Sequence, residues 1–286
     1  MKKVLIVYFS QGKTNMRVAE AISKGLIEAG HEIKIWNLMD GRPPDPREYD
    51  LFGIGSPTYY FQLPFIVTDY VNGLPDLSGL PAFVFVVNGS HRGNTGNSLR
   101  HALSLKNARE LGYFHCHGAS YFLGYLKVGY LFSADHPSTD DLTRAAEFGR
   151  EVAAHLAGER YVKPGDDPPG ALLYRVERLA FSRCLVKHVY SRLFRTNARC
   201  RPDCDLCIKQ CPAKNITRGE DGRLLRGRDC LLCLSCEKNC PEDAITSLVA
   251  GPILRPVMLL NTFLGSRDPS LDYARVIHKN GQTQRL

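Results

Sequence analysis

A doubled cysteine pattern in the second half of the 286-residue chain is the sequence feature that most constrains its fold. The pattern C-x2-C-x2-C-x3-C-P starts at Cys230, and a copy with one extra residue in its first gap starts at Cys200. Equivalent cysteines of the two copies, such as Cys204 and Cys233, lie 29 residues apart. This shared register indicates an internal duplication built around metal ligands.

The chemistry of the cysteines favours iron–sulfur clusters, because iron bound to sulfide prefers soft, anionic thiolate ligands. In a two-cluster arrangement the fourth cysteine of each run binds the other cluster. We therefore assign one [4Fe–4S] cluster to Cys200, Cys204, Cys207 and Cys240, and the second to Cys230, Cys233, Cys236 and Cys211. Structural zinc fits poorly, since zinc sites take four ligands in two pairs and each run here holds four cysteines. Clustered cysteines in a reducing compartment also indicate metal rather than disulfides.

Residues 197–250 resemble the bacterial two-cluster ferredoxins through both cysteine runs and the prolines that follow them, Pro212 and Pro241. The resemblance implies a small α+β domain that holds two [4Fe–4S] clusters. The longer gap between Cys200 and Cys204 departs from the family pattern. If Cys200 is not a ligand, a three-iron cluster is the alternative at that site.

The first half of the chain alternates strand and helix patterns. Residues 4–9 form a continuous apolar run, as expected for a central parallel strand, and residues 15–28 show helical apolar spacing that Gly30 can end. Further strands are predicted at 31–38, 51–55, 82–87 and 113–120, with helices at 64–72, 97–111 and 140–156. Five strands with helical crossovers predict an α/β fold with a doubly wound, five-stranded parallel sheet.

Ligands of such sheets bind beyond the carboxyl ends of the strands, where three polar loops are expected here. The first loop contains Gly12-Lys13-Thr14, but Val7 occupies the position of the first glycine of a triphosphate-binding loop. A short loop that opens a helix still suits a phosphate monoester, because free backbone N–H groups and the helix dipole favour an anion by about 0.3–2 kcal/mol. The alternative is that Ser10 only caps the helix.

Together, the three loops and the segment RVAEAI at 17–22 resemble flavodoxin over residues 1–160. The resemblance implies FMN, with its phosphate at the first loop and its isoalloxazine ring between the other two. The implied residues are Ser10, Gln11, Gly12, Lys13, Thr14 and Asn15 in the phosphate loop, Ser56, Pro57, Thr58, Tyr59 and Tyr60 in the first ring loop, and Asn88, Gly89, Ser90, His91, Arg92 and Gly93 in the second ring loop. The hydroxyls of the phosphate loop are displaced from the family pattern, so we expect Lys13, Thr14 or Asn15 to replace the missing one. His91 or Arg92 is expected to stabilise the reduced flavin.

Residues 163–196 read as a linker followed by one basic amphipathic helix over 171–196, and residues 251–286 as a C-terminal extension. Fourteen Lys or Arg and six Asp or Glu fall within 171–229, so the net charge of +8 is concentrated there. We favour a helix that packs the two domains together, with its charge offsetting that of the cofactors. The alternatives are peripheral contact with an anionic membrane and docking of an acidic redox partner. No nucleic-acid-binding module is recognised.

The combination resembles the iron–sulfur flavoproteins in which a flavodoxin-like domain, here 1–162, is fused to a ferredoxin-like domain, here 197–250. It implies a protein that passes electrons between FMN and two [4Fe–4S] clusters and converts between one- and two-electron partners. The alternative is an FMN-dependent reductase of a small molecule fed by the clusters; an oxygen sensor is a third class. No catalytic residue is assigned. We expect a cytoplasmic protein, with redox proteins as partners, and a homodimer is left open.

Overall fold

The computed structural model describes residues 1–169 and 172–286, and it divides into two compact units. Unit 1 comprises Met1–Ala119 and Asp135–Arg178, and unit 2 comprises Ser120–Ala134 and Leu179–Leu286. Gly170 and Ala171, where the predicted linker meets the predicted basic helix, lie outside the described residues. Within the described residues, no helix is long and apolar enough to cross a membrane.

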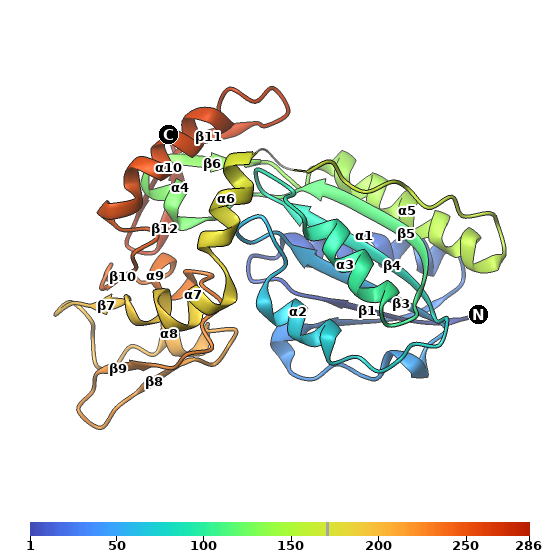
Figure 1. Cartoon of the computed structure of the whole chain (residues 1–286), viewed down its shortest axis with the longest axis horizontal. Coiled ribbons are helices and arrows are strands. Elements are labelled where there is room, and N and C mark those ends of the chain that lie inside the picture. Colours follow the sequence, from blue (N-terminus) through green and yellow to red (C-terminus); the bar gives the residue numbers. More distant parts are fainter. Residues whose placement is uncertain (170–171) are drawn as a thin grey trace. The chain divides into compact units, whose positions relative to one another are not determined.

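Unit 1 contains a five-stranded parallel sheet with the order β2-β1-β3-β4-β5 (Figure 1). The strands are β1 (Lys3–Tyr8), β2 (Glu32–Asn37), β3 (Leu51–Pro57), β4 (Pro81–Asn88) and β5 (Arg109–His117). After its first residue β1 is buried throughout, as its apolar run predicts for a strand covered on both faces. The predicted doubly wound sheet is confirmed, and its strand order is that of flavodoxin.

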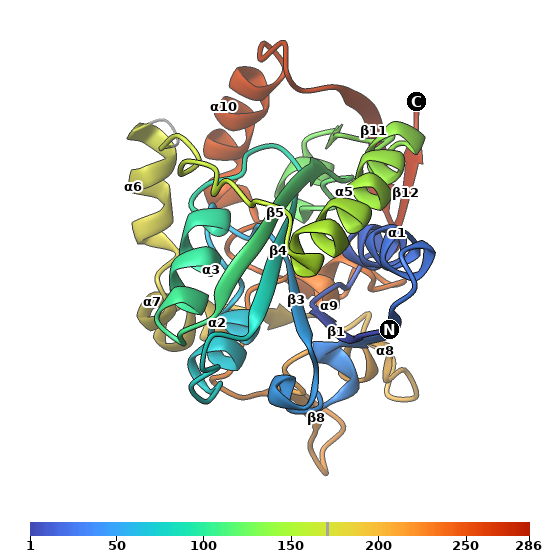
Figure 2. The same ribbon diagram turned by 90° about the vertical axis from the view of Figure 1, so that its right-hand side faces the viewer.

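Helices cover both faces of this sheet. Figure 2 shows α1 (Thr14–Glu28) and α5 (Thr139–Ala157) on one face, and α2 (Phe65–Asn72) and α3 (Thr95–Ser104) on the other. Helices α1 and α5 approach closely at Gly25, where an added Cβ would lie 2.0 Å from a backbone oxygen of α5. Two 3₁₀ turns, η1 (Leu38–Asp40) and η2 (Pro46–Glu48), connect β2 to β3.

The helix predicted over 97–111 is wrong at its end, because α3 stops at Ser104 and β5 begins at Arg109. A turn separates the two elements, with Asn107 in the left-handed region at φ 58°. The backbone N–H of Arg109 donates to Leu80 O at 2.9 Å, at the start of the strand pairing between β4 and β5. Arg109 and Glu110, which helical spacing placed in the predicted helix, therefore pair with β4 instead.

Unit 2 includes a short segment that lies between β5 and α5 in the sequence. This segment forms α4 (Leu123–Lys127) and β6 (Tyr130–Phe132). Strand β6 pairs with β11 (Tyr273–Lys279), which pairs with β12 (Gln282–Arg285), and α4 packs on α10 (Arg255–Gly265), which η4 (Pro252–Leu254) precedes. Tyr125, Phe132, Met258 and Leu271 form the buried core between them.

The cysteine-rich part of unit 2 repeats itself in structure as well as in sequence. Its elements are β7 (Arg195–Thr196), α8 (Leu206–Lys209), β8 (Ile216–Arg218), β9 (Leu224–Arg226), α9 (Ser235–Lys238) and β10 (Ile245–Thr246). β7 pairs with β10 and β8 with β9. Helices α8 and α9 occupy equivalent positions of the repeat, and Asn239 Nδ2 donates at 2.7 Å to Gln210 Oε1, its equivalent residue. The region thus consists of small sheets and short helices related by the duplication.

The single basic helix predicted over 171–196 is wrong. The described residues form α6 (Leu172–Ala180), α7 (Arg183–His188) and a 3₁₀ turn, η3 (Tyr190–Arg192). Ser182 has an extended backbone that ends one helix and begins the next. The preceding Phe181 is buried and stacks on Tyr190 at 5.4 Å between ring centroids, so packing of this aromatic side chain overrides the continuous helical spacing.

Candidate functional site

The predicted phosphate loop joins β1 to α1 and leaves buried polar atoms unpaired. Lys13 adopts a left-handed conformation at φ 66° and begins α1. Asn15 is 1% exposed and Ser10 7% exposed. Among the described residues, neither the Ser10 hydroxyl nor either amide atom of Asn15 has a hydrogen-bond partner. An unpaired buried polar group costs about 1–3 kcal/mol, so these atoms fit a polar group bound in the loop.

The first predicted ring loop follows β3, and a tight turn forms its tip. Tyr59 and Gln62 exchange two backbone hydrogen bonds of 3.0 Å each, and Tyr60 and Phe61 between them have positive φ. The Tyr59 hydroxyl donates to Gln11 Oε1 at 2.5 Å, which ties this loop to the phosphate loop. At the base of the loop, the Ser56 hydroxyl donates to the carbonyl of Pro57 at 2.9 Å.

The second ring loop, from Asn88 through Gly89 and Ser90 to Gly93, is joined directly to the first. The Thr58 hydroxyl donates to Arg92 O at 3.1 Å, and Asn94 N donates to Phe61 O at 3.0 Å. Gly93 has φ +59°, and a Cβ there would lie 2.2 Å from Phe61 O. Only glycine therefore permits this approach of the two loops.

Three rings meet where the two ring loops join. The Tyr174 ring from α6 lies 4.8 Å from that of Phe61 and 4.2 Å from that of His91. Tyr174 and Phe61 are residues that the sequence analysis missed. Phe61 directly follows the predicted loop, whereas no pattern within the predicted basic helix distinguishes Tyr174 from its neighbours.

Arg92 is held by the largely buried carboxylate of Asp167. Its Nη1 lies 3.0 Å from Asp167 Oδ1 and 2.8 Å from His115 Nε2. Burial and, after it, the charge of Arg92 lower the pKa of His115, which favours the neutral imidazole. Asp167 also exchanges two hydrogen bonds with Asn97 of α3, so residues just before α6 are fixed against unit 1.

A histidine pair lies at the end of β5, next to the second ring loop, and consists of His117, the last residue of that strand, and His136. Asn88 Nδ2 is 3.4 Å from Nδ1 of His117, whose ring centroid lies 5.7 Å from that of His136. His136 Nδ1 is 2.5 Å from Oδ2 of the buried Asp141. Burial alone would raise the pKa of Asp141, but hydrogen bonds from Ser138, His136 and Arg144 lower it to about 2. This pair was not predicted, because its members are adjacent only in the fold.

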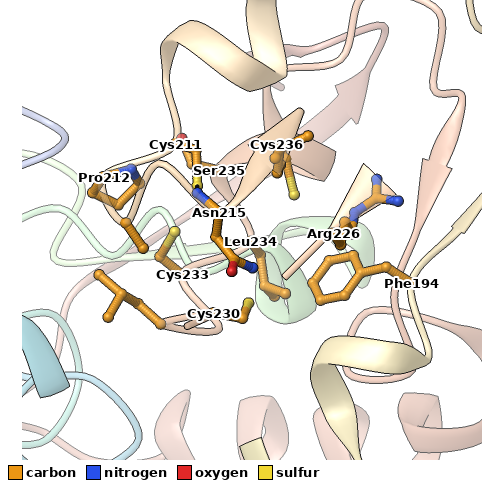
Figure 3. A pocket seen from close by; sticks show the side chains of 13 residues that line it. Phe194, Cys211, Pro212, Asn215, Arg226, Cys230, Cys233, Leu234, Ser235 and Cys236 are labelled. Atoms are coloured by element: carbon orange, nitrogen blue, oxygen red, sulfur yellow. Dashed lines mark hydrogen bonds between the residues drawn. The ribbon is translucent and has the colours of Figure 1, made fainter. Parts of the chain in front are cut away.

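One group of predicted cluster ligands surrounds a pocket in unit 2. Figure 3 shows Cys211, Cys230, Cys233 and Cys236 around it, with Phe194 and Arg226 along one side. Cys211 belongs to the first cysteine run and the other three to the second. Burial raises the pKa of the Cys230 thiol to about 11, and Cys233 and Cys211 add to this effect. Backbone N–H groups of Asn215 and Leu232 donate to Cys211 Sγ and Cys230 Sγ, each at 3.3 Å.

The other predicted group of cluster ligands consists of Cys200, Cys204, Cys207 and Cys240. Burial raises the pKa of Cys207, and the nearby Cys200 and Cys204 raise it further. Cys240 Sγ accepts a hydrogen bond of 3.3 Å from Ala244 N, the equivalent of the bond to Cys211 in the other copy. Across 1–169 and 172–286, no three His, Cys, Asp or Glu side chains form a site for a single metal ion. The assignment of the eight cysteines as cluster ligands stays a prediction.

Comparisons with known proteins bear on unit 1. A family model described as a flavodoxin domain matches residues 5–122. Similar solved structures include a flavodoxin from the domain Archaea (16% identity, 54% of this chain and 99% of that chain, TM-score 0.42). A second is oxidised flavodoxin 1 from Bacillus cereus (18% identity, 54% of this chain and 98% of that chain, TM-score 0.43). A third is the rubredoxin oxygen:oxidoreductase from the anaerobe Desulfovibrio gigas (14% identity, 54% of this chain and 36% of that chain, TM-score 0.43). No curated protein matches the chain. By this family match and the order of its sheet, the N-terminal part of the chain contains a flavodoxin domain.

Proposed function

We propose that this protein transfers electrons between FMN and two [4Fe–4S] clusters and converts between one- and two-electron partners. The observation that carries the proposal is the mixed origin of the cysteine pocket. Cys211 of the first run lines it together with three cysteines of the second run. This exchange of the fourth cysteine is the ligand pattern of two-cluster ferredoxins.

The flavodoxin domain implies FMN binding, and the phosphate loop has the groups that would hold it. The buried Ser10 hydroxyl and Asn15 amide lack partners, and the helix dipole of α1 favours an anion at the same place. The two ring loops would hold the isoalloxazine ring. When bound, FMN supplies the ability to accept two electrons and to release them singly.

The arrangement of the cysteines supports a cluster rather than a single ion in this proposal. Thiolates around one zinc ion converge to about 2.3 Å from a common point, and no such group occurs in the described part of the chain. A four-iron cluster instead presents a separate iron to each thiolate, so its ligands surround a larger volume. The backbone N–H groups that donate to Cys211 and Cys230 would stabilise the thiolates.

An FMN-dependent reductase is the second candidate, and the histidine pair at the end of β5 favours it. His136 is held by Asp141, and His117 connects it to Asn88 of the second ring loop. A histidine oriented by a buried carboxylate can deliver a proton to a substrate near the ring loops. Electron transfer alone does not require such a group.

Anaerobic reconstitution tests the proposal. We expect one FMN, about eight irons and about eight sulfides per chain. Cys233→Ser should lose about half of the iron, whereas Cys184→Ser should keep it, because the exposed Cys184 lies outside both runs. Wild-type protein without flavin would contradict the FMN half, and wild-type protein without iron would contradict the cluster half. Turnover of a small molecule without any protein acceptor would favour the reductase.

The proposed partners are redox proteins with acidic surfaces, because the segment 171–229 is strongly basic. Contact of the segment 171–196 with a membrane surface, a homodimer and a cytoplasmic location stay predictions.

A further inference from the structure

Arg226 is the last residue of β9 and lines the cysteine pocket with two buried donors that have no partner. Its Nη1 donates to Thr196 Oγ1 at 3.3 Å, but Nε and Nη2 are buried and make no hydrogen bond with any described residue. Buried N–H groups of a guanidinium are costly unless an anionic group satisfies them. Arg226 lines the same pocket as Cys230, Cys233 and Cys236, and Figure 3 shows it beside Phe194 at one side of this pocket. An anionic group held by these cysteines would offset the cost of the unpaired donors.

The side chain is held at this place by its surroundings. Arg226 pairs with Ile216 across the β8–β9 hairpin, and its guanidinium lies 5.4 Å from the ring centroid of Phe194. A cation over an aromatic face is attracted to the ring by about 0.5–2 kcal/mol. The contact with Phe194 therefore favours the observed position of the Arg226 charge at the pocket.

Arg226 faces the ligands of one predicted cluster. The pocket that it lines also contains Cys211, Cys230, Cys233 and Cys236, the four cysteines assigned to the second cluster. One cation thus lies at the side of the pocket of this cluster.

We propose that Arg226 is a positive group that donates N–H bonds to the second cluster, assigned to Cys211, Cys230, Cys233 and Cys236, and raises the reduction potential of that cluster. This inference rests on the proposed function, since it requires the clusters. A cluster gains one negative charge on reduction, and a fixed cation nearby favours the more negative state. Hydrogen bonds to cluster sulfur act in the same direction. Arg226 is a tuning residue and not a ligand.

The test compares the potentials of both clusters in reconstituted full-length protein, by redox titration monitored by electron paramagnetic resonance. Arg226→Met removes the charge and both free donors but keeps an aliphatic side chain against Phe194. Arg226→Lys keeps the charge and loses the fork of donors. Arg223→Met is the matched control, because Arg223 lies at the turn of the same hairpin with an 85% exposed side chain.

We expect the potential of the second cluster to become more negative in Arg226→Met, with a smaller shift in Arg226→Lys and none in Arg223→Met. An unchanged potential of this cluster in Arg226→Met would overturn the inference. If Arg226→Met loses iron, Arg226→Lys replaces it in the test, since an unchanged potential of the second cluster in Arg226→Lys would overturn the role of the donors. Wild-type protein that takes up no iron would refute the proposed function itself, whereas iron-replete variants with wild-type potentials would refute only this inference.

Discussion

Replacing Asn15 by leucine should raise the stability of the flavin-free protein and weaken its binding of FMN. Both polar atoms of the Asn15 amide are buried and unpaired among the described residues. Leucine has a similar branched shape and no polar atom, so Asn15→Leu removes an unpaired buried group. It also removes Nδ2 of Asn15, the amide donor that the proposed phosphate site would use.

The magnitudes follow from these two effects. An unpaired buried amide costs about 1–3 kcal/mol, so the flavin-free variant should gain about 1 kcal/mol or more. In a unit of this size, that corresponds to a rise in Tm of about 2–4 °C. A hydrogen bond to a charged group contributes about 1.5–3 kcal/mol, so the Kd for FMN should rise about ten- to a hundredfold.

Fluorescence titration with FMN and with riboflavin separates the phosphate from the ring. Riboflavin has no phosphate, so its Kd should stay within about twofold of the wild-type value in Asn15→Leu. Asn97→Leu is the control, because both amide atoms of Asn97 are paired with the backbone of Asp167. That variant should be less stable, with an unchanged ratio of the FMN and riboflavin affinities. Equal weakening of both ligands in Asn15→Leu, or a lower Tm of its flavin-free form, would refute the phosphate site.

Three further predictions concern the ring loops, pH and the composition of unit 2. Tyr174→Ala should raise the Kd for FMN about three- to tenfold, because it loses the ring contacts with Phe61 and His91. Tyr174→Phe and the exposed control Val176→Ala should leave the Kd unchanged. Equal FMN affinities in all three variants would contradict a role for α6. Because the pKa of Asp141 is lowered to about 2 from 3.8, its stabilising effect is complete above pH 4 and is lost as the pH falls toward 2. The Tm difference between wild type and Asp141→Asn should narrow over that range, and a constant difference would refute the assignment. Residues 179–286 expressed alone should not unfold cooperatively, because β6 and α4 are missing from the core of unit 2, and cooperative unfolding by circular dichroism would show that Ser120–Ala134 are dispensable.

The sheet of unit 1 could be predicted from the sequence, because buried parallel strands read as continuous apolar runs. β1 and β4 have such runs and are buried after their first residue. Boundaries were less predictable where tertiary contacts compete with local spacing. Pairing with β4 shortened α3 at Ser104, and the buried Phe181 divided the predicted basic helix. Neither contact can be recognised from the local spacing of apolar residues in the sequence.

In the candidate site, the loops could be predicted but their partners could not. Ser10 and Asn15 belong to a short loop between a strand and a helix, which a sequence pattern identifies. Tyr174 contacts Phe61 and His91, which are distant from it in the sequence, so its own neighbours carry no signal. Arg226 was counted only as one of many basic residues, although it is distinguished by two buried donors without partners.

The segment Ser120–Ala134 shows how chain order and spatial order differ in this protein. It directly follows the last strand of the flavodoxin sheet, yet its Lys127 forms an ion pair with the buried Glu237 of α9. Glu237 follows the predicted ligand Cys236 and also accepts a hydrogen bond of 2.9 Å from Ser247 N. A segment inserted in the flavodoxin part of the sequence therefore supports the backbone next to a predicted cluster ligand. Because the cores of the two units are interleaved along the chain, unit 2 cannot complete its core until residues from the first half of the sequence are present.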